Sequence, residues 1–313
     1  MPHPRQFATI PLTETPRATD GLTATVPRQL VHRASVAETF LIGATSTGTD
    51  RFTVLAQWPR AHQLHVSPDR SAYEPLLVAE TVRQTAALLA HTAYDVPLGH
   101  QFVLRELRIS TRPECLAVGA VPAEPVLHIA VSDVDHRAGR PAGFRCDADI
   151  RLGDERVATG HLAVTWTNEA VYRRLRGGRT ATTVSALPIP PGLPPAAVDR
   201  ALPADVVLAP TGRPGRWQLR VDTAHAVFFD HPLDHVPGML LLEAARQAAR
   251  ARTRNGRRRP VSFHAVFHQY AELDQLTWIE AVDGESANGD GVQVLGGQGE
   301  STVFECEVGT EGW

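Results

Sequence analysis

The segment LLVAETVRQTA (Leu76–Ala86) returns 163 residues later as MLLLEAARQAA (Met239–Ala249). Five of the eleven positions are identical, and three of these are polar: Glu80/Glu243, Arg83/Arg246 and Gln84/Gln247. Strand-like segments around them repeat as well, with Asp50–Trp58 echoed by Gly215–Asp222 and Gln101–Ser110 by Val261–Tyr270. Self-similarity at one fixed offset indicates a duplicated structural unit.

Each copy combines one apolar helix with several alternating segments. Residues Pro75–Ala93 and Pro237–Ala251 are apolar nearly all round, which is typical of a helix buried on most sides. Apolar residues alternate with charged ones along two later segments, the period of a β-strand: Phe144, Cys146, Ala148 and Ile150, and then Phe304, Cys306 and Val308. One buried helix wrapped by an antiparallel sheet is the hot-dog fold. We therefore predict an α+β protein with two tandem hot-dog domains, a double hot-dog.

The chain length of 313 residues also favours two domains. We expect a disordered or loose leader over 1–26, a first hot-dog domain over 27–179, a Pro-rich linker over 180–203 and a second hot-dog domain over 204–313. The Arg-rich segment Val171–Arg179 is expected to form a solvated helical turn or tether.

Composition excludes several classes of function. A net charge of -3 argues against a broadly basic nucleic-acid binder. No apolar run approaches the roughly 20 residues of a membrane span, and no secretory signal is evident. All 31 basic residues are Arg, so the Lys amine of Schiff-base, pyridoxal phosphate and P-loop chemistry is missing. The three cysteines lie far apart in the sequence, so we expect neither disulfides nor a thiol zinc site. The same pattern predicts a cytoplasmic location.

Charged residues in such apolar helices require partners or a function. Glu80, Arg83 and Gln84 share one side of the first helix by their i, i+3 and i+4 spacing. A structural ion pair between helix and sheet is one interpretation. The other is a site at the interface of the two domains, in which Glu80 faces Arg246 and Glu243 faces Arg83.

Four motifs resemble the AfsA family, the γ-butyrolactone autoinducer synthases of filamentous actinobacteria. They are LVHRASVAETFL (Leu30–Leu41), YEPLLVAETVRQTA (Tyr73–Ala86), VYRRLRG (Val171–Gly177) and DHVPGMLLLEAARQAA (Asp234–Ala249). The resemblance covers the chain from about Pro27 to the last strand. It implies transfer of a β-ketoacyl group from acyl carrier protein, or from coenzyme A, to the hydroxyl of dihydroxyacetone phosphate. Some relatives supply furan-type signals instead.

The resemblance also implies site residues. Glu80 and Arg246 are expected to be catalytic: Glu80 as a general base whose pKa burial raises toward neutrality, Arg246 as a binder of phosphate or oxyanion. We expect substrate contacts from Arg83, Glu243, Gln84, Gln247, His62 and His235. No cofactor, metal, nucleic acid or membrane is expected. The two domains should form a pseudo-dimer within a monomer, with further oligomerisation left open.

Alternative functions remain open at this point. The second copy also resembles hot-dog dehydratases, but His65 and His231 lie out of register with the dehydratase histidine. A hot-dog thioesterase or dehydratase is therefore the second enzymatic hypothesis, and a non-catalytic sensor of acyl ligands is the third. The histidine pairs His62/His65 and His231/His235 lack a convincing third metal ligand.

Three smaller features carry expectations of their own. The cysteines are expected to be core residues rather than nucleophiles. Asp234 and His235 are expected to cap the second helix. The basic run Ala249–Pro260 fits a solvated loop and a docking patch for acidic acyl carrier protein equally well.

Overall fold

The computed structural model describes residues 24–252, 258–286 and 289–312, and two central helices dominate it. Helix α1 spans Pro75–Thr92 and helix α3 spans Gly238–Arg252, each within one residue of the predicted bounds. Pro75 occupies the first turn of α1, where its missing N–H costs no hydrogen bond. Most of the expected leader, and residues 253–257 of the basic run, lie outside the described residues.

Twelve strands form one antiparallel sheet in the order β1-β2-β4-β5-β6-β3-β9-β12-β11-β10-β8-β7. The first copy contributes β1 (Leu41–Gly48), β2 (Arg51–Ala56), β3 (Gln101–Thr111), β4 (Val126–Arg137), β5 (Arg140–Leu152) and β6 (Glu155–Thr167). The second contributes β7 (Leu208–Pro210), β8 (Arg216–Leu219), β9 (Arg258–Phe267), β10 (Thr277–Ser286), β11 (Gly289–Gln298) and β12 (Ser301–Gly312). The two halves have the same strand order, reversed about the β3–β9 junction.

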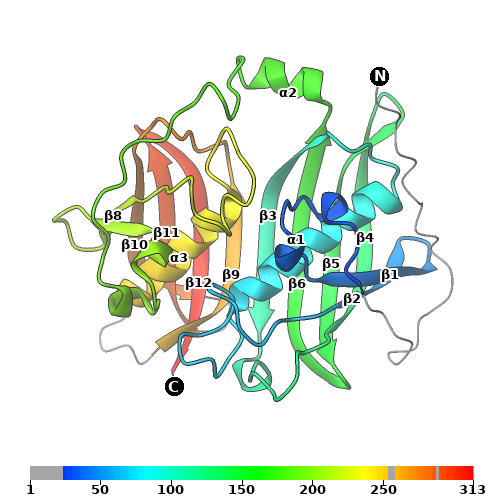
Figure 1. The fold of residues 1–313 in the computed structure, drawn as a ribbon, viewed down its shortest axis with the longest axis horizontal. Coiled ribbons are helices and arrows are strands. Elements are labelled where there is room, and N and C mark those ends of the chain that lie inside the picture. Colours follow the sequence, from blue (N-terminus) through cyan, green and yellow to red (C-terminus); the bar gives the residue numbers. More distant parts are fainter. Residues whose placement is uncertain (1–23, 253–257, 287–288, 313) are drawn as a thin grey trace.

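The two domains share a single continuous sheet because β3 pairs with β9. Glu106–Ser110 lie antiparallel to Ser262–Val266 at that junction. Figure 1 shows α1 and α3 on the same face of this sheet, each across its own half. One long helix against each half of the sheet confirms the predicted double hot-dog.

The alternating strand pattern faces the core as predicted. Cys146 and Cys306 are buried, and burial raises the pKa of the Cys146 thiol to about 12, so neither is a reactive nucleophile. Close packing requires glycine at position 160 of β6. A Cβ on Gly160 would lie 2.7 Å from the Val82 side chain of α1. The helix therefore lies directly against the strand at this point.

Short 3-10 helices extend the duplication upstream of where the sequence analysis placed it. In the first copy η1 (Arg28–Val31) and η2 (Val36–Glu38) precede β1, and in the second η4 (Pro195–Val198) and η5 (Pro203–Asp205) precede β7. Both η1 and η4 end at a residue in the left-handed conformation, followed by Arg33 in one case and Arg200 in the other. The second half of the expected linker is thus a counterpart of the start of the first domain.

Two further elements complete the chain. Helix α2 (Glu169–Leu175) lies at the top of Figure 1, beyond the ends of the strands and between the two halves of the sheet. The short helix η3 (Pro113–Cys115) follows β3. Within the described ranges, none of the helices combines the length and hydropathy that a membrane crossing requires.

The burial of α1 makes a stability prediction. Leu77 is completely buried in α1, whereas Leu175 at the end of α2 is 71% exposed. Leu77→Ala should lower the free energy of unfolding by about 2–5 kcal/mol, because it removes apolar contacts and leaves a cavity. Leu175→Ala is the matched control and should lower it by less than about 0.5 kcal/mol. Chemical denaturation measures both, and equal losses would contradict the assignment of α1 as the core helix.

Candidate active site

Glu80 is the centre of a fully buried ionic cluster on α1. Arg33 binds it through Nε (3.0 Å) and a terminal nitrogen (2.7 Å), and Arg83 does so through Nε (2.8 Å) and a terminal nitrogen (2.7 Å). The Gln84 amide donates a further hydrogen bond of 2.7 Å. Both oxygens of the carboxylate therefore accept hydrogen bonds from protein donors, most of them on Oε1.

This environment corrects the expectation that Glu80 is a general base. Burial alone would raise the pKa of Glu80, but the charges of Arg33 and Arg83 and their hydrogen bonds outweigh it and hold the pKa well below its usual range. A carboxylate that stays ionised against two guanidinium groups is a poor proton acceptor. Glu80 instead positions the two arginines.

Helix α3 carries the equivalent cluster. Glu243 accepts two hydrogen bonds from Arg200, one of 2.8 Å from Nε, and another of 2.7 Å from Gln247. Gln84 and Gln247 each also bind the backbone of the preceding 3-10 segment, donating to the carbonyls of Glu38 and Asp205. The contacts of Arg33 and Gln84 with Glu80 are thus repeated by Arg200 and Gln247 with Glu243.

Arg33 and Arg200 were not identified by the sequence analysis, yet each links the two domains. Arg33 donates to the backbone carbonyl of Val227 at 3.0 Å, and Arg200 donates to that of Leu64 at 3.1 Å. The sequence signal was the pair VHR and VDR, at Val31–Arg33 and Val198–Arg200, 167 residues apart. The helices repeat at an offset of 163 residues, so a search for repeats at that single offset does not find the VHR/VDR pair.

The predicted pairs of Glu80 with Arg246 and of Glu243 with Arg83 do not form. Arg246 instead makes a bidentate pair with Glu74, at 2.7 and 3.0 Å, and also donates to the carbonyls of Val198 and Asp199. Its side chain is 1% exposed. An arginine so enclosed has no donor directed at a substrate phosphate.

The two sites differ at the residue that precedes the helix. Glu74, which seals Arg246, corresponds at the 163-residue offset to Pro237, which has no carboxylate. Arg83 therefore has no counterpart of the Glu74 carboxylate beside it, and the Arg83 side chain is 22% exposed. Of these two equivalent arginines, Arg246 is enclosed by protein groups (closed) and Arg83 is partly accessible to solvent (open).

The open arginine lies in a cleft of about 1050 Å³ between the domains. Its walls come from α1, β3, α2 and the segments on either side of α3. Of the eight predicted site residues, Arg83 and His235 line it; apolar lining residues include Leu104, Leu162, Met239 and Phe267. A cleft of this size with a mostly apolar wall suits an acyl chain with a polar head group.

His32 and His231 line the cleft together with Arg83. His32 contacts His91 through their Nε2 atoms at 2.8 Å, and His91 Nδ1 lies 2.6 Å from the carbonyl of Val96. Burial, and then the charges of Arg83, His91 and His231, lower the pKa of His32 to about 3. The positive charge of Arg83 opposes protonation of His32, and the same charge favours an anion beside it.

Asp234 and His235 also line this cleft. The Asp234 carboxylate accepts hydrogen bonds from Tyr172 Oη (2.7 Å) and Arg176 Nε (3.0 Å) and lies 2.7 Å from His235 Nδ1. These bonds replace the helix-capping role expected for the pair. Arg176 is 5% exposed and also binds Glu272, which corrects the expectation that this Arg-rich segment is only a solvated tether.

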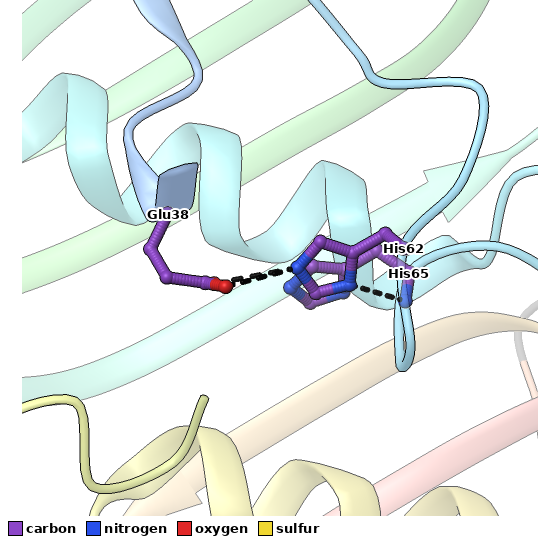
Figure 2. Close-up of side chains that lie close together, drawn as sticks. All are labelled: Glu38, His62 and His65. Atoms are coloured by element: carbon purple, nitrogen blue, oxygen red, sulfur yellow. Dashed lines mark hydrogen bonds and ion pairs between the residues drawn. The ribbon is translucent and has the colours of Figure 1, made fainter. Parts of the chain in front are cut away.

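His62 belongs to a different cluster, with Glu38 and His65 (Figure 2). The three groups lie within 4.8 Å of one another, so Glu38 is the third potential ligand that the sequence did not reveal. However, His62 Nδ1 accepts the backbone N–H groups of Leu64 and His65, both at 3.1 Å. The proton of the neutral ring is then on Nε2, directed at Glu38 at 3.2 Å, where a metal would need a lone pair.

The second copy supports a structural role for this pair. His225 binds Asp205 at 3.2 Å and accepts the N–H groups of Val227 and Phe228 in the same way. Phe228 occupies the position of His65 there, so the turn forms without a third ligand. The histidine and its acid stabilise the turn in both domains.

The pH dependence of the free energy of unfolding, compared between the wild type and a Glu80 variant, tests the buried cluster. Glu80→Gln should lower the free energy of unfolding at pH 7 by about 3–5 kcal/mol, because buried Arg33 and partly buried Arg83 lose their counter-charge. The folded pKa of Glu80 lies below its unfolded value of about 4.3. The carboxylate therefore stabilises the wild type fully above that pH, and its contribution is lost as the pH falls further.

The gap between wild type and Glu80→Gln should consequently narrow below about pH 4, as measured by urea denaturation at several pH values. Glu114→Gln, at a solvent-exposed carboxylate paired with Arg112, is the matched control and should change little. A gap that stays constant down to pH 3 would show that Glu80 is not held ionised.

The chain is similar to known proteins both in sequence and in fold. The family model described as "A-factor biosynthesis hotdog domain" (AfsA) matches residues 15–168 and 181–282. A "2-oxo-3-(phosphooxy)propyl 3-oxoalkanoate synthase" of Streptomyces virginiae is 48% identical over 93% of this chain and 99% of its own. Another of the same name from Streptomyces griseus is 42% identical over 88% of this chain and 92% of its own.

Solved structures show the same fold at low identity. A 12:0-ACP thioesterase from Umbellularia californica has a TM-score of 0.51 and 11% identity, covering 83% of this chain and 98% of its own. An oleoyl thioesterase from Lactobacillus plantarum has a TM-score of 0.51 and 12% identity, covering 84% and 95%. The thioesterases share the double hot-dog, and the sequence relationship is closer: this chain belongs to the AfsA family of A-factor biosynthesis hot-dog proteins.

Proposed function

We propose that this protein is a 2-oxo-3-(phosphooxy)propyl 3-oxoalkanoate synthase, an acyltransferase of autoinducer biosynthesis. It transfers a 3-oxoacyl group from an acyl carrier protein or coenzyme A thioester to the hydroxyl of dihydroxyacetone phosphate. Relatives at 48% and 42% identity, matched over almost their whole length, carry that name. The observation in this chain that supports it best is the inter-domain cleft, which combines an apolar wall with an accessible arginine.

Within this proposal Arg83 binds the phosphate of the acceptor. Its Nε and one terminal nitrogen are held by Glu80, with an additional bond to the carbonyl of Val31 at 3.1 Å. The partly exposed guanidinium is thereby fixed in orientation while it faces the cleft, which is the pre-organisation that phosphate binding requires. His32 and His231 line the cleft near this guanidinium.

Glu80 and Arg246 act indirectly in this proposal. Glu80 orients Arg83 and Arg33, and Arg246 stabilises the closed equivalent of the site through Glu74. Glu243, Gln84 and Gln247 complete the same buried networks. Loss of activity on substitution of these residues would then come with loss of stability.

A product assay tests the proposed function directly. Purified protein with a 3-oxooctanoyl thioester, on coenzyme A or on acyl carrier protein, and dihydroxyacetone phosphate should yield the phosphorylated ester by mass spectrometry. Release of free 3-oxo acid at the same rate without the acceptor would identify a thioesterase instead. Binding of the thioester without turnover, for both carriers, would favour the acyl-ligand sensor.

Arg83→Gln tests the phosphate contact. The KM for dihydroxyacetone phosphate should rise about 10- to 100-fold, the range of a hydrogen-bonded charge contact of about 1.5–3 kcal/mol. With dihydroxyacetone, which has no phosphate, the variant and the wild type should turn over at similar rates. Arg108→Gln is the matched control, because Arg108 lies on β3, is 56% exposed and pairs with Glu106. An equal loss with both acceptors would show that Arg83 does not recognise the phosphate.

A further inference from the structure

We propose that His235, oriented by Asp234, is the general base that accepts the proton of the attacking hydroxyl. The inference rests on the proposed acyl transfer and adds the group that the buried Glu80 cannot supply. Asp234 and His235 lie next to each other in the chain and form an acid–histidine pair that lines the inter-domain cleft.

The hydrogen bonds define the tautomer of His235. Burial would raise the pKa of Asp234, but bonds from His235, Tyr172 and Arg176 hold it well below its usual range. An ionised carboxylate only accepts hydrogen bonds, so the ring nitrogen 2.7 Å away, Nδ1, must carry the proton. In the neutral imidazole the lone pair is then on Nε2, the nitrogen that a general base uses.

Nε2 is available to a substrate. The His235 side chain is 22% exposed, and its ring packs edge-on against the ring of Tyr270, with 4.7 Å between the two centroids.

 The angle between the two ring planes is 65°. Both hydrogen-bond contacts of this ring among the described residues use Nδ1, to Asp234 and to Tyr172. The other ring nitrogen is thus left for a ligand in the cleft.

The pair occurs in one copy of the repeat. At the 163-residue offset, Asp234 and His235 correspond to Ser71 and Ala72. The backbones match, because Ala72 bridges to Ala117 as His235 bridges to Glu272. The fold therefore forms this bridge without a histidine, and the second copy has gained an ionisable pair at the open cleft.

A purely structural role explains less of the arrangement. Arg176 joins Asp234 to Glu272 and so anchors the segment after α2 to the second domain. That anchor needs the Asp234 carboxylate and the Arg176 guanidinium, and neither bond involves the imidazole. His235 is therefore the member of the network that structure alone does not require.

The other candidate bases in the cleft are less suitable. His32 has its Nε2 occupied by His91, and its pKa of about 3 makes it a weak base. His231 binds Asp230 and lies near His32, which is itself near Arg83, where we place the phosphate. Glu80 is completely buried and held by donors from three residues.

The reaction balances with the imidazole as proton carrier. The acceptor hydroxyl gives its proton to His235 Nε2 as its oxygen bonds to the thioester carbonyl carbon. The tetrahedral intermediate then collapses, the carbon–sulfur bond breaks, and the imidazolium returns the proton to the departing thiolate. Asp234 stabilises the transient imidazolium and keeps its own charge.

His235→Ala with added imidazole tests the proposal in the full-length protein. The kcat for ester formation should fall about 10²- to 10⁴-fold, with little change in the KM for dihydroxyacetone phosphate, and imidazole should restore part of it. His161→Ala is the matched control: His161 lies on β6 with its Nδ1 2.8 Å from Asp147, outside the cleft. It should behave as the wild type does.

The outcomes separate this inference from the proposed function. A wild type that forms no ester refutes the acyltransferase itself. If the wild type forms ester, then a His235→Ala kcat near that of the wild type, or a loss that imidazole does not relieve, overturns the role of His235. His231→Ala should raise the KM for dihydroxyacetone phosphate. If imidazole restores the kcat of that variant instead, His231 is the base.

Discussion

Two buried carboxylates, Glu80 and Glu243, organise the junction of the domains. Each lies in an apolar helix and is neutralised by an arginine from its own copy, Arg33 or Arg200. Each arginine also donates to a backbone carbonyl of the opposite domain. Removing either partner would leave an uncompensated charge out of water, which costs several kcal/mol. The helices and the segments before them are therefore held in one relative arrangement.

The asymmetry of the site follows from differences between the copies at two positions. Glu74 binds the guanidinium of Arg246, and Pro237 at the corresponding position leaves that of Arg83 open. Asp199, 3.6 Å from Arg246, corresponds to His32 in the first copy. One of the two duplicated ionic clusters is therefore structural, and the other is accessible. Asp234 and His235, which also occur in one copy, lie on the same cleft as the accessible arginine.

The buried cluster and the catalytic chemistry separate on physical grounds. A carboxylate surrounded by guanidinium groups is an excellent anchor, since its charge is retained, and for the same reason it is a poor base. A partly exposed imidazole with one nitrogen fixed by a carboxylate has the opposite properties. The conspicuous acidic residue of the repeat therefore supports the site, and a less conspicuous neighbour has the geometry for proton transfer.

The sequence by itself determined the duplication, both central helices, the inward faces of the strands and the family. These features depend on local periodicity and on similarity over the whole chain, which one sequence displays directly. Only the tertiary structure decided the partners of Glu80 and Arg246, the closure by Glu74 and the lining of the cleft. Arg246 and Glu74 are 172 residues apart, as their hydrogen bonds record, and no local pattern encodes such a contact. The geometry of two packed domains selects which of several possible charges meet.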